Sequence, residues 1–310
     1  MPVSTSVHIS HSIERIVSVN PETVLDVGCG FGLWGFLCRE YLDVWNGRVL
    51  PAEWQTRIDG IEVFPPYIQA HQRALYNNIL VKDVREAVNE IGEYDLIIAG
   101  DVIEHLDKPD AENVLEMLYE KASKALLLNI PIGPGWNHPE AHGNPGELHR
   151  SQWATEDFVQ YPAESVMFDL PCGRYGVFWC VKTVSPKLRA EGLVAAAEIR
   201  ERRGENEAAM RMLKKAQQLD PANETVLIPL VNFLLNSGET TEAIGCLQNA
   251  LKEQSDLYAV RLLLARVLAL ASHHDEAHRE LTSLLDDAST PEEIAQNARK
   301  HLEDIRNRFA

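Results

Sequence analysis

Short apolar segments alternate with longer stretches of helical periodicity along the first half of the chain. This alternation predicts a mostly parallel sheet with helices packed on it, which is a doubly wound α/β fold. The last two apolar segments have no helical stretch between them, so we expect a terminal antiparallel hairpin that turns at residues 171–174. The seven predicted strands are Thr23–Val27, Arg57–Glu62, Ile79–Lys82, Asp95–Gly100, Ala125–Ile130, Val166–Leu170 and Gly176–Thr183.

The pattern changes at Pro186, beyond which no strand pattern occurs and helix-forming residues dominate. Small residues recur 34 positions apart at Gly204, Gly238 and Ser272. A period of this length predicts stacked helical hairpins, because a single hairpin cannot bury its apolar face alone. Three further sets of positions share the spacing: Ala209, Ala243 and Ala277; Leu213, Leu247 and Leu281; Ala216, Ala250 and Leu284.

These positions resemble the small and large positions of tetratricopeptide repeats (TPR), and Asp220-Pro221 resembles the proline that closes such a repeat. The second and third repeats lack this proline, and an unrelated antiparallel helical bundle is the alternative. A last helix from Pro291 to about Phe309, with Thr290 as its N-cap, would cover the open end. The resemblance implies a TPR-like array that binds a protein partner or pairs two copies of the chain. We therefore expect two domains, 1–185 and 186–310.

Composition and charge exclude several classes of protein. The chain has 310 residues, of which 45% are hydrophobic and 24% charged, and its net charge is −17. Nucleic-acid binding needs Lys and Arg against phosphates, so this balance argues against nucleic acid as a partner. No apolar run approaches the ~20 residues of a membrane span, and the first twelve residues lack a signal-peptide pattern, so we expect a cytoplasmic protein without a membrane partner. Five scattered cysteines without a C-x-x-C pair predict neither a disulfide framework nor a structural zinc site.

The most specific local pattern is Asp26-x-Gly28-x-Gly30-x-Gly32, directly after the first predicted strand. Its glycines allow the backbone to turn sharply and to approach a ligand closely. A helix predicted over Leu33–Tyr41 would point its N-terminus at that ligand. An overlapping G-x-G-x-x-G pattern from residue 30 would suit a dinucleotide, but that pattern alone is weakly specific.

Three further segments follow in a fixed order. The second strand ends in Glu62, the third leads into Asp83, and the fourth continues as D-x-x-E-H-L from Asp101 to Leu106. Together with the glycine loop, these segments resemble the motifs of class I S-adenosylmethionine-dependent methyltransferases, over roughly residues 10–185. The D-x-x-E-H-L continuation argues against a nicotinamide oxidoreductase. The resemblance implies a Rossmann-like fold and S-adenosylmethionine as the cofactor.

In such a site Glu62 would bind both ribose hydroxyls, since a carboxylate has two acceptor oxygens. Asp83 would contact the adenine amine. Asp26 would lie near the methionine ammonium, or would only brace the loop through backbone hydrogen bonds. The cofactor-binding residues that the resemblance implies are Asp26, Gly28, Cys29, Gly30, Gly32, Glu62, Val63, Asp83, Val84, Asp101 and Val102.

The candidate catalytic residues are His105 and His149. His105 follows the fourth strand and could brace the loop, act as a base, or bind a metal with Asp101 or Glu104. His149 closes a long polar segment, residues 131–150, after the fifth strand, and long loops in compact domains are often functional. This segment offers further histidines and an acid, but no pair of ligands four residues apart on a helix, so we expect substrate-lining side chains and no metal site.

These observations predict methyl transfer to an oxygen or nitrogen atom of a small molecule or sugar. S-adenosylmethionine carries a good leaving group, so the protein would mainly supply proximity and orientation. A base is needed only if the nucleophile must lose a proton. The alternative is an interaction scaffold whose methyltransferase fold binds the cofactor without turnover.

Overall fold

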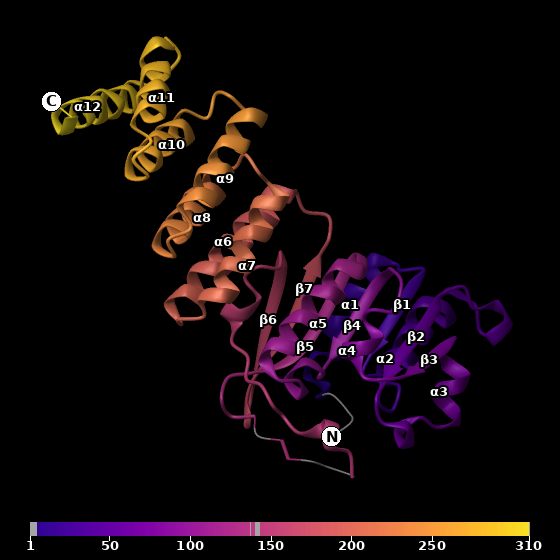
Figure 1. The fold of residues 1–310 in the computed structure, drawn as a ribbon. Coiled ribbons are helices and arrows are strands. Elements are labelled where there is room, and N and C mark those ends of the chain that lie inside the picture. The colour runs from indigo at the N-terminus through magenta and orange to yellow at the C-terminus, as the bar shows by residue number, and fades with distance from the viewer. Residues whose placement is uncertain (1–4, 137, 140–142, 310) are drawn as a thin grey trace. The chain divides into compact units, whose positions relative to one another are not determined.

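The computed structural model describes residues 5–136, 138–139 and 143–309, with only the backbone for residues 306–309. The chain divides into two compact units, Met1–Val184 and Ser185–Ala310. The first unit contains the sheet, and the second is built from helices (Figure 1). None of the helices among the described residues combines the length and hydrophobicity that a membrane span requires.

A seven-stranded sheet in the order β3-β2-β1-β4-β5-β7-β6 forms the centre of the first unit. The strands from β1 to β5 pair in parallel, whereas β7 pairs antiparallel with both β5 and β6. The predicted doubly wound sheet with a terminal hairpin is therefore confirmed. The strands are β1 (Thr23–Val27), β2 (Arg57–Glu62), β3 (Asn78–Val81), β4 (Tyr94–Gly100), β5 (Ala122–Ile132), β6 (Ala163–Leu170) and β7 (Gly173–Val181).

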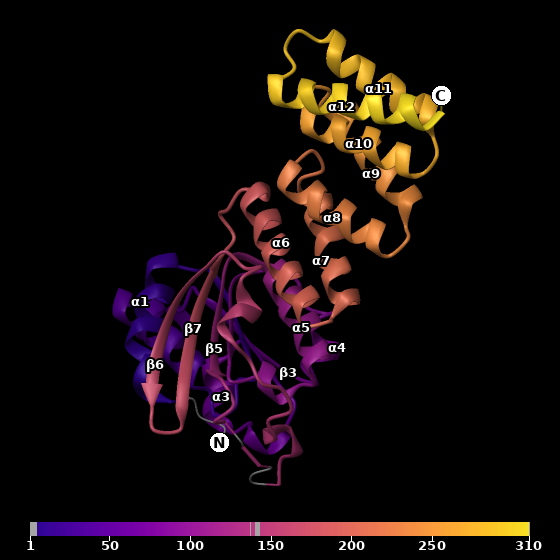
Figure 2. The same cartoon turned by 90° about the vertical axis from the view of Figure 1, so that its left-hand side faces the viewer.

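Helices cover both faces of the sheet, because successive strand side chains point to opposite faces. Val24 of β1 packs with residues of α1 (Ile9–Val19) and α2 (Leu33–Cys38), whereas Leu25 packs on the face covered by α4 (Val84–Ala87) and α5 (Lys108–Lys121). Figure 2 shows the hairpin edge with α1 on one side of the sheet and α4 and α5 on the other. The remaining helix, α3 (Ala70–Leu75), leads into β3.

Local differences from the predicted elements have physical causes. The hairpin turns at Pro171 and Cys172, because Gly173 already pairs with Leu170 across the two strands. The helix predicted over 33–41 keeps α-helical geometry only to Cys38, and a π-helical turn follows over Arg39–Asp43. Helix α1 was not predicted.

The π-helical turn carries a buried ionic cluster. The guanidinium of Arg39 donates to Asp43 and to the backbone carbonyl oxygens of Thr56 and Leu75. Asp43 also accepts from Arg48 and from the N–H groups of residues 55 and 56. These bonds satisfy two charges that would be costly to bury alone, and they tie the segment before β2 to the end of α2.

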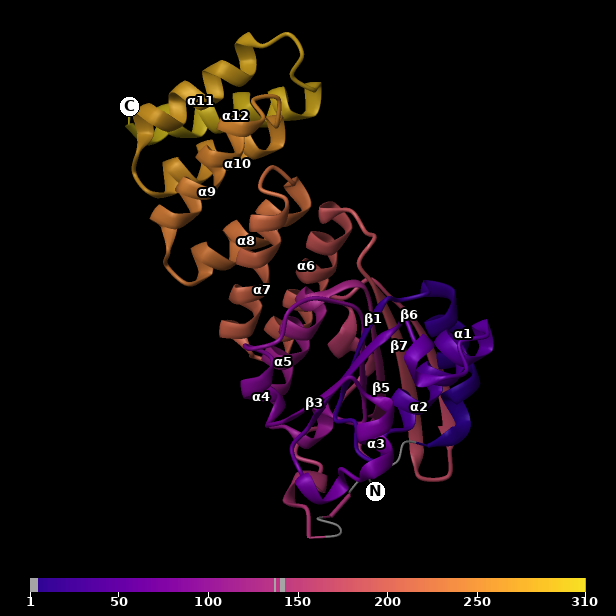
Figure 3. The ribbon, with the colours of Figure 1, turned by 90° about the vertical axis from the view of Figure 1, so that its right-hand side faces the viewer.

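Helical hairpins follow one another through the second unit (Figure 3). In the turn after the first helix of each hairpin, one residue lies in the left-handed region, with φ of 77° at Gly204, 80° at Gly238 and 65° at Ser272. The alanines and leucines at the 34-residue spacing are all buried. The helices are α6 (Pro186–Arg202), α7 (Asn206–Leu219), α8 (Glu224–Asn236), α9 (Thr240–Glu253), α10 (Tyr258–Leu270), α11 (His274–Asp286) and α12 (Glu292–Phe309).

The last helix covers an apolar surface, as the sequence predicts. Ala298 and Leu302 of α12 pack against Leu262 of α10 and Leu281 of α11. The predicted N-cap is wrong, because the hydroxyl of Thr290 has no hydrogen-bond partner within the described residues.

Candidate functional site

A cavity of about 440 Å³ lies over the carboxyl ends of the parallel strands. This is the edge at which doubly wound sheets bind their ligands. Its volume lies in the range of small-molecule sites, about 300–1,000 Å³. The loops after β1, β2, β3 and β4 line it, together with part of the segment that follows β5.

The glycine loop after β1 has the conformation that its sequence predicts. Gly28 has a φ of +67°, and a Cβ at this position would lie 2.7 Å from Cγ2 of Val102. Only glycine therefore lets the loop pass this close to the end of β4. The next residue, Cys29, donates its N–H to the carbonyl oxygen of Ile61 at 2.9 Å, which ties the loop to β2.

Tyr76, which the sequence analysis missed, anchors the glycine loop through two hydrogen bonds. The hydroxyl of Tyr76 donates to Oδ2 of Asp26 and accepts the N–H of Gly35 at 3.0 Å. Burial, and then the charge of Glu62, raise the pKa of Asp26 to about 7, against the lowering effect of the Tyr76 hydrogen bond. Asp26 and Gly32 do not line the cavity, so this network favours the bracing role for Asp26.

Glu62 ends β2 in the wall of the cavity, with 5% of its surface exposed. Oε2 accepts the N–H of Gly30 at 2.9 Å, and Oε1 accepts the N–H of Phe64 at 2.8 Å. Burial raises the pKa of this carboxyl group, and the two backbone hydrogen bonds oppose that shift. Each oxygen keeps capacity for a second hydrogen bond, so the carboxylate suits a ligand with two adjacent hydroxyls.

The acids after β3 and β4 also line the cavity. Asp83 caps α4 by accepting the N–H of Arg85 and forms an ion pair with the Arg85 guanidinium, which lowers its pKa. Asp101 has a φ of +52°, a conformation that few residues other than glycine adopt. Its Oδ1 accepts the hydroxyl of Tyr175 at 2.8 Å. Strained backbone of this kind often marks a functional site.

The structure brings the two predicted catalytic histidines together. The rings of His105 and His149 meet edge to face, with centroids 4.8 Å apart. The segment after β5 is held against the turn after β4, because the N–H groups of Arg150 and Ser151 donate to the backbone carbonyl oxygen of Glu104 at 2.8 and 3.0 Å. Burial, and then His149, lower the pKa of His105 to about 4, and burial also lowers the pKa of His149.

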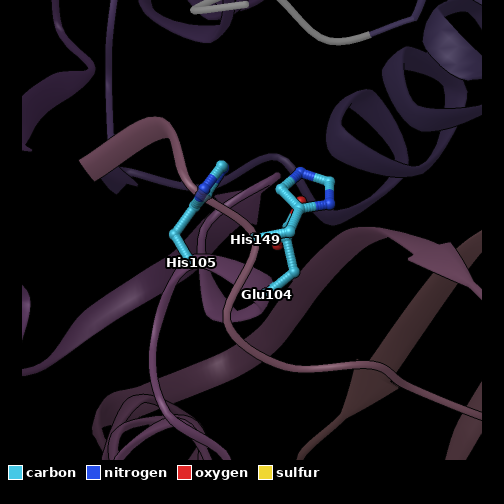
Figure 4. A group of neighbouring side chains, drawn as sticks. All are labelled: Glu104, His105 and His149. Atoms are coloured by element: carbon cyan, nitrogen blue, oxygen red, sulfur yellow. The ribbon is translucent and has the colours of Figure 1, made fainter. Parts of the chain in front are cut away.

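Glu104 completes this cluster; the sequence analysis named it only as one possible metal ligand beside His105. One ligand atom each from Glu104, His105 and His149 lie within 4.8 Å of one another (Figure 4). Burial, and then the charge of Asp101, raise the pKa of Glu104 well above its usual range. Its place in the D-x-x-E-H-L segment was the available signal, since it neighbours a candidate catalytic histidine.

Most of the predicted cofactor-binding residues share the cavity, as does His105, whereas His149 lies beside His105 without lining it. Tyr67 was missed, whereas Asn144 and Glu147 belong to the polar segment that was expected to line the substrate. The Tyr67 hydroxyl donates to Glu147 at 2.9 Å in the cavity wall. The predicted residues that line the cavity are Gly28, Cys29, Gly30, Glu62, Val63, Asp83, Val84, Asp101, Val102 and His105.

No match is found among curated proteins. Among solved structures, magnesium protoporphyrin IX methyltransferase from Synechocystis PCC 6803 is 16% identical with a TM-score of 0.40, over 57% of this chain and 84% of its own. TehB from Haemophilus influenzae is 14% identical with a TM-score of 0.42, over 58% of this chain and 64% of its own. The N-methyltransferase NodS from Bradyrhizobium japonicum is 13% identical with a TM-score of 0.38, over 57% of this chain and 97% of its own. The sequence model of the tetratricopeptide repeat family matches residues 202–256, so the helical unit contains a tetratricopeptide repeat.

Proposed function

We propose that the protein is an S-adenosylmethionine-dependent methyltransferase that acts on an oxygen or nitrogen atom of a small molecule or sugar. The observation that carries this proposal is Glu62, a nearly buried carboxylate beside a glycine loop in the wall of a cavity. It can accept two further hydrogen bonds, which suits the adjacent hydroxyls of a ribose.

The chain's own residues fit this cofactor. Glu62 would bind the ribose, and Asp83 would lie at the adenine. Asp26 would keep the loop in place through Tyr76. Bound S-adenosylmethionine would supply a methyl group on a sulfonium sulfur, so the protein mainly contributes orientation. The residues proposed to line the cofactor are Gly28, Cys29, Gly30, Glu62, Val63, Asp83, Val84, Asp101 and Val102.

We place His105 and His149 on the acceptor side. Their lowered pKa values keep both imidazoles neutral near pH 7. In each ring Nδ1 lies within hydrogen-bond distance of a backbone carbonyl oxygen, of Leu148 and of Trp136 respectively. A carbonyl oxygen only accepts, so Nδ1 carries the proton and Nε2 keeps its lone pair.

Calorimetric titration with S-adenosylhomocysteine and with NAD tests the cofactor. We expect micromolar binding of the first and none of the second; heat from NAD alone would contradict the proposal. Release of S-adenosylhomocysteine with a panel of hydroxyl and amine acceptors tests turnover. If His149 is the base, His149→Ala should lower turnover ~100-fold while S-adenosylhomocysteine affinity holds. If His105 braces the loop, His105→Ala should weaken S-adenosylhomocysteine binding and lower stability together. Cofactor binding without transfer to any acceptor would favour the scaffold alternative.

For the helical unit we propose protein binding or self-association. Stacked helical repeats form extended surfaces that proteins commonly use for binding. Sedimentation of the full chain separates the two roles. A dimer supports self-association, and a monomer at all concentrations leaves a separate protein as the partner.

A further inference from the structure

Glu104 lies in a cluster with His105 and His149, and the proposed function gives this buried acid no role. Two imidazoles and one carboxylate converge from two segments that are far apart in sequence, the turn after β4 and the long segment after β5 (Figure 4). We propose that this cluster binds a divalent transition-metal cation, such as Zn²⁺, Mn²⁺ or Co²⁺.

The first support is the state of Glu104. Its side chain is almost completely buried, with 1% of its surface exposed. Within the described chain, no hydrogen bond of normal geometry reaches either of its carboxylate oxygens. The charge of its neighbour Asp101 has the same sign and opposes ionisation of Glu104, and a side-chain interaction with Asp101 favours the protonated form of Glu104. A carboxylate is costly to bury alone, and a bound cation would allow Glu104 to be buried in its ionised form.

The second support is the orientation of the imidazoles. Nδ1 of His105 lies 3.3 Å from the carbonyl oxygen of Leu148, and Nδ1 of His149 lies 2.9 Å from that of Trp136. Metal-binding histidines commonly donate one ring N–H to a backbone carbonyl oxygen, which fixes the tautomer and leaves the other nitrogen for the metal. Both histidines of the cluster have this arrangement.

The ligand set determines the kind of cation. Imidazole nitrogen suits Zn²⁺, Fe²⁺ and Co²⁺, carboxylate oxygen suits Mn²⁺ as well, and two histidines with one carboxylate leave coordination positions open. Bonds of about 2.0–2.2 Å require ligand atoms roughly 3–3.5 Å apart. The present separations, up to 4.8 Å, would therefore shorten by about 1–2 Å through side-chain rotation.

Because His105 also lines the cavity, the open positions of the cation would be available to a molecule bound there. If the proposed function holds, that molecule is the acceptor, bound through an oxygen atom. A metal-bound Nε2 cannot accept a proton, so the cation replaces a base role for these histidines. Binding of the cation itself does not depend on the proposed function.

The test is a calorimetric titration of the full chain, first treated with a chelator, with Zn²⁺ or Mn²⁺ and without S-adenosylmethionine. We expect one equivalent to bind. Glu104→Gln, which keeps the side-chain volume, and His149→Ala should each weaken binding at least ~10-fold, the smallest loss typical of metal sites. His278→Ala, which removes a histidine from α11, is the matched control and should bind as the parent does. Equal affinity in all four proteins, or no binding by the parent, would overturn the proposal.

Thermal unfolding in chelator shows whether each variant folds. If neither Glu104→Gln nor His149→Ala folds, NMR of the parent chain tests whether the cation binds at this cluster. Substoichiometric Mn²⁺ should broaden the ring signals of His105 and His149 before those of the other nine histidines. Broadening that begins elsewhere would contradict the site. A separate titration with S-adenosylhomocysteine keeps the two proposals distinct, because either ligand can bind while the other fails.

Discussion

Glu62 is the single residue on which the proposed cofactor site most depends. Glu62→Ala removes the acceptor for two ribose hydroxyls and should cost ~1–3 kcal/mol of S-adenosylhomocysteine affinity, measured by calorimetry. Glu22→Ala is the control, since Glu22 is an exposed acid that does not line the cavity. An unchanged affinity in folded Glu62→Ala would mean that Glu62 does not contact the cofactor.

Asp43 makes a different contribution, to stability. Its side chain is fully buried at 0% exposure. Burial alone would raise its pKa, but the bonds from the N–H of Gln55, from Arg48 and from Arg39 outweigh burial and lower it. A lowered folded pKa means that the stabilisation is present above the unfolded value of about 3.9 and is lost as pH falls through the folded pKa.

Asp43→Asn should therefore lower the free energy of unfolding at pH 7 by about 3–5 kcal/mol, because Arg39 would keep a buried charge without its partner. The deficit should shrink as pH falls below about 4, because Asp43 of the unfolded parent takes up a proton there and the parent loses the stabilisation from this charge. Urea unfolding of the parent and of Asp43→Asn at pH 7 and pH 3 measures this difference in the free energy of unfolding. A deficit that does not change with pH would show that the Asp43 charge is not the source.

Among the elements, the turns within the helical hairpins share one hydrogen-bond pattern. The residue after Gly204, Gly238 and Ser272 donates its N–H to the carbonyl oxygen five residues earlier, at 2.9, 2.8 and 2.9 Å. This pattern ends a helix with a left-handed residue, where glycine has no steric penalty. Ser272 adopts the same φ with a side chain and is therefore strained.

Ser272→Gly should raise the free energy of unfolding by about 0.5–1 kcal/mol by relieving this strain, net of the greater freedom of glycine in the unfolded chain. Gly204→Ala is the reverse test and should cost about 1–2 kcal/mol, because an added Cβ meets no atom within 4 Å and only the φ is strained. Chemical denaturation measures both. A loss of stability in Ser272→Gly would refute the explanation.

The elements were more predictable than the site. Apolar runs predicted all seven strands, and the 34-residue period predicted the helical hairpins. For the parallel strands the reason is that a strand buried on both faces needs continuous apolar residues. Contacts between distant segments leave no pattern in the local sequence. Tyr76 bonds to Asp26 across 50 residues, and the fold brings His149 beside His105 from a separate segment. The π-helical turn likewise has long-range partners, because Arg39 donates to the carbonyl oxygens of Thr56 and Leu75.

The whole molecule contains two compact units, and we predict that they fold independently. Strand β7 ends at Val181, and each unit has apolar clusters of its own. A fragment of residues 1–185 should unfold cooperatively and bind S-adenosylhomocysteine with the affinity of the full chain. Calorimetry and thermal unfolding test this, with the full chain as the control. A fragment that does not fold would show that the helices belong to the same cooperative unit.

The recurring left-handed turn gives the helical array a fixed unit of growth. Tandem duplication of the segment from Gly204 to Ser237 would add 34 residues that begin at one left-handed turn and end just before the next. Each copy would pack against the same kinds of helices that flank the segment in the present chain. Helix α12 would still cover Leu262 and Leu281, because the new segment enters ahead of them. The lengthened chain should remain folded, and its helical circular dichroism signal should rise in proportion to the residues added. Aggregation or an unchanged signal would show that the 34-residue spacing alone does not define the structural repeat. The helical array can therefore be extended by duplication of one 34-residue segment, and no new kind of turn or interface is needed.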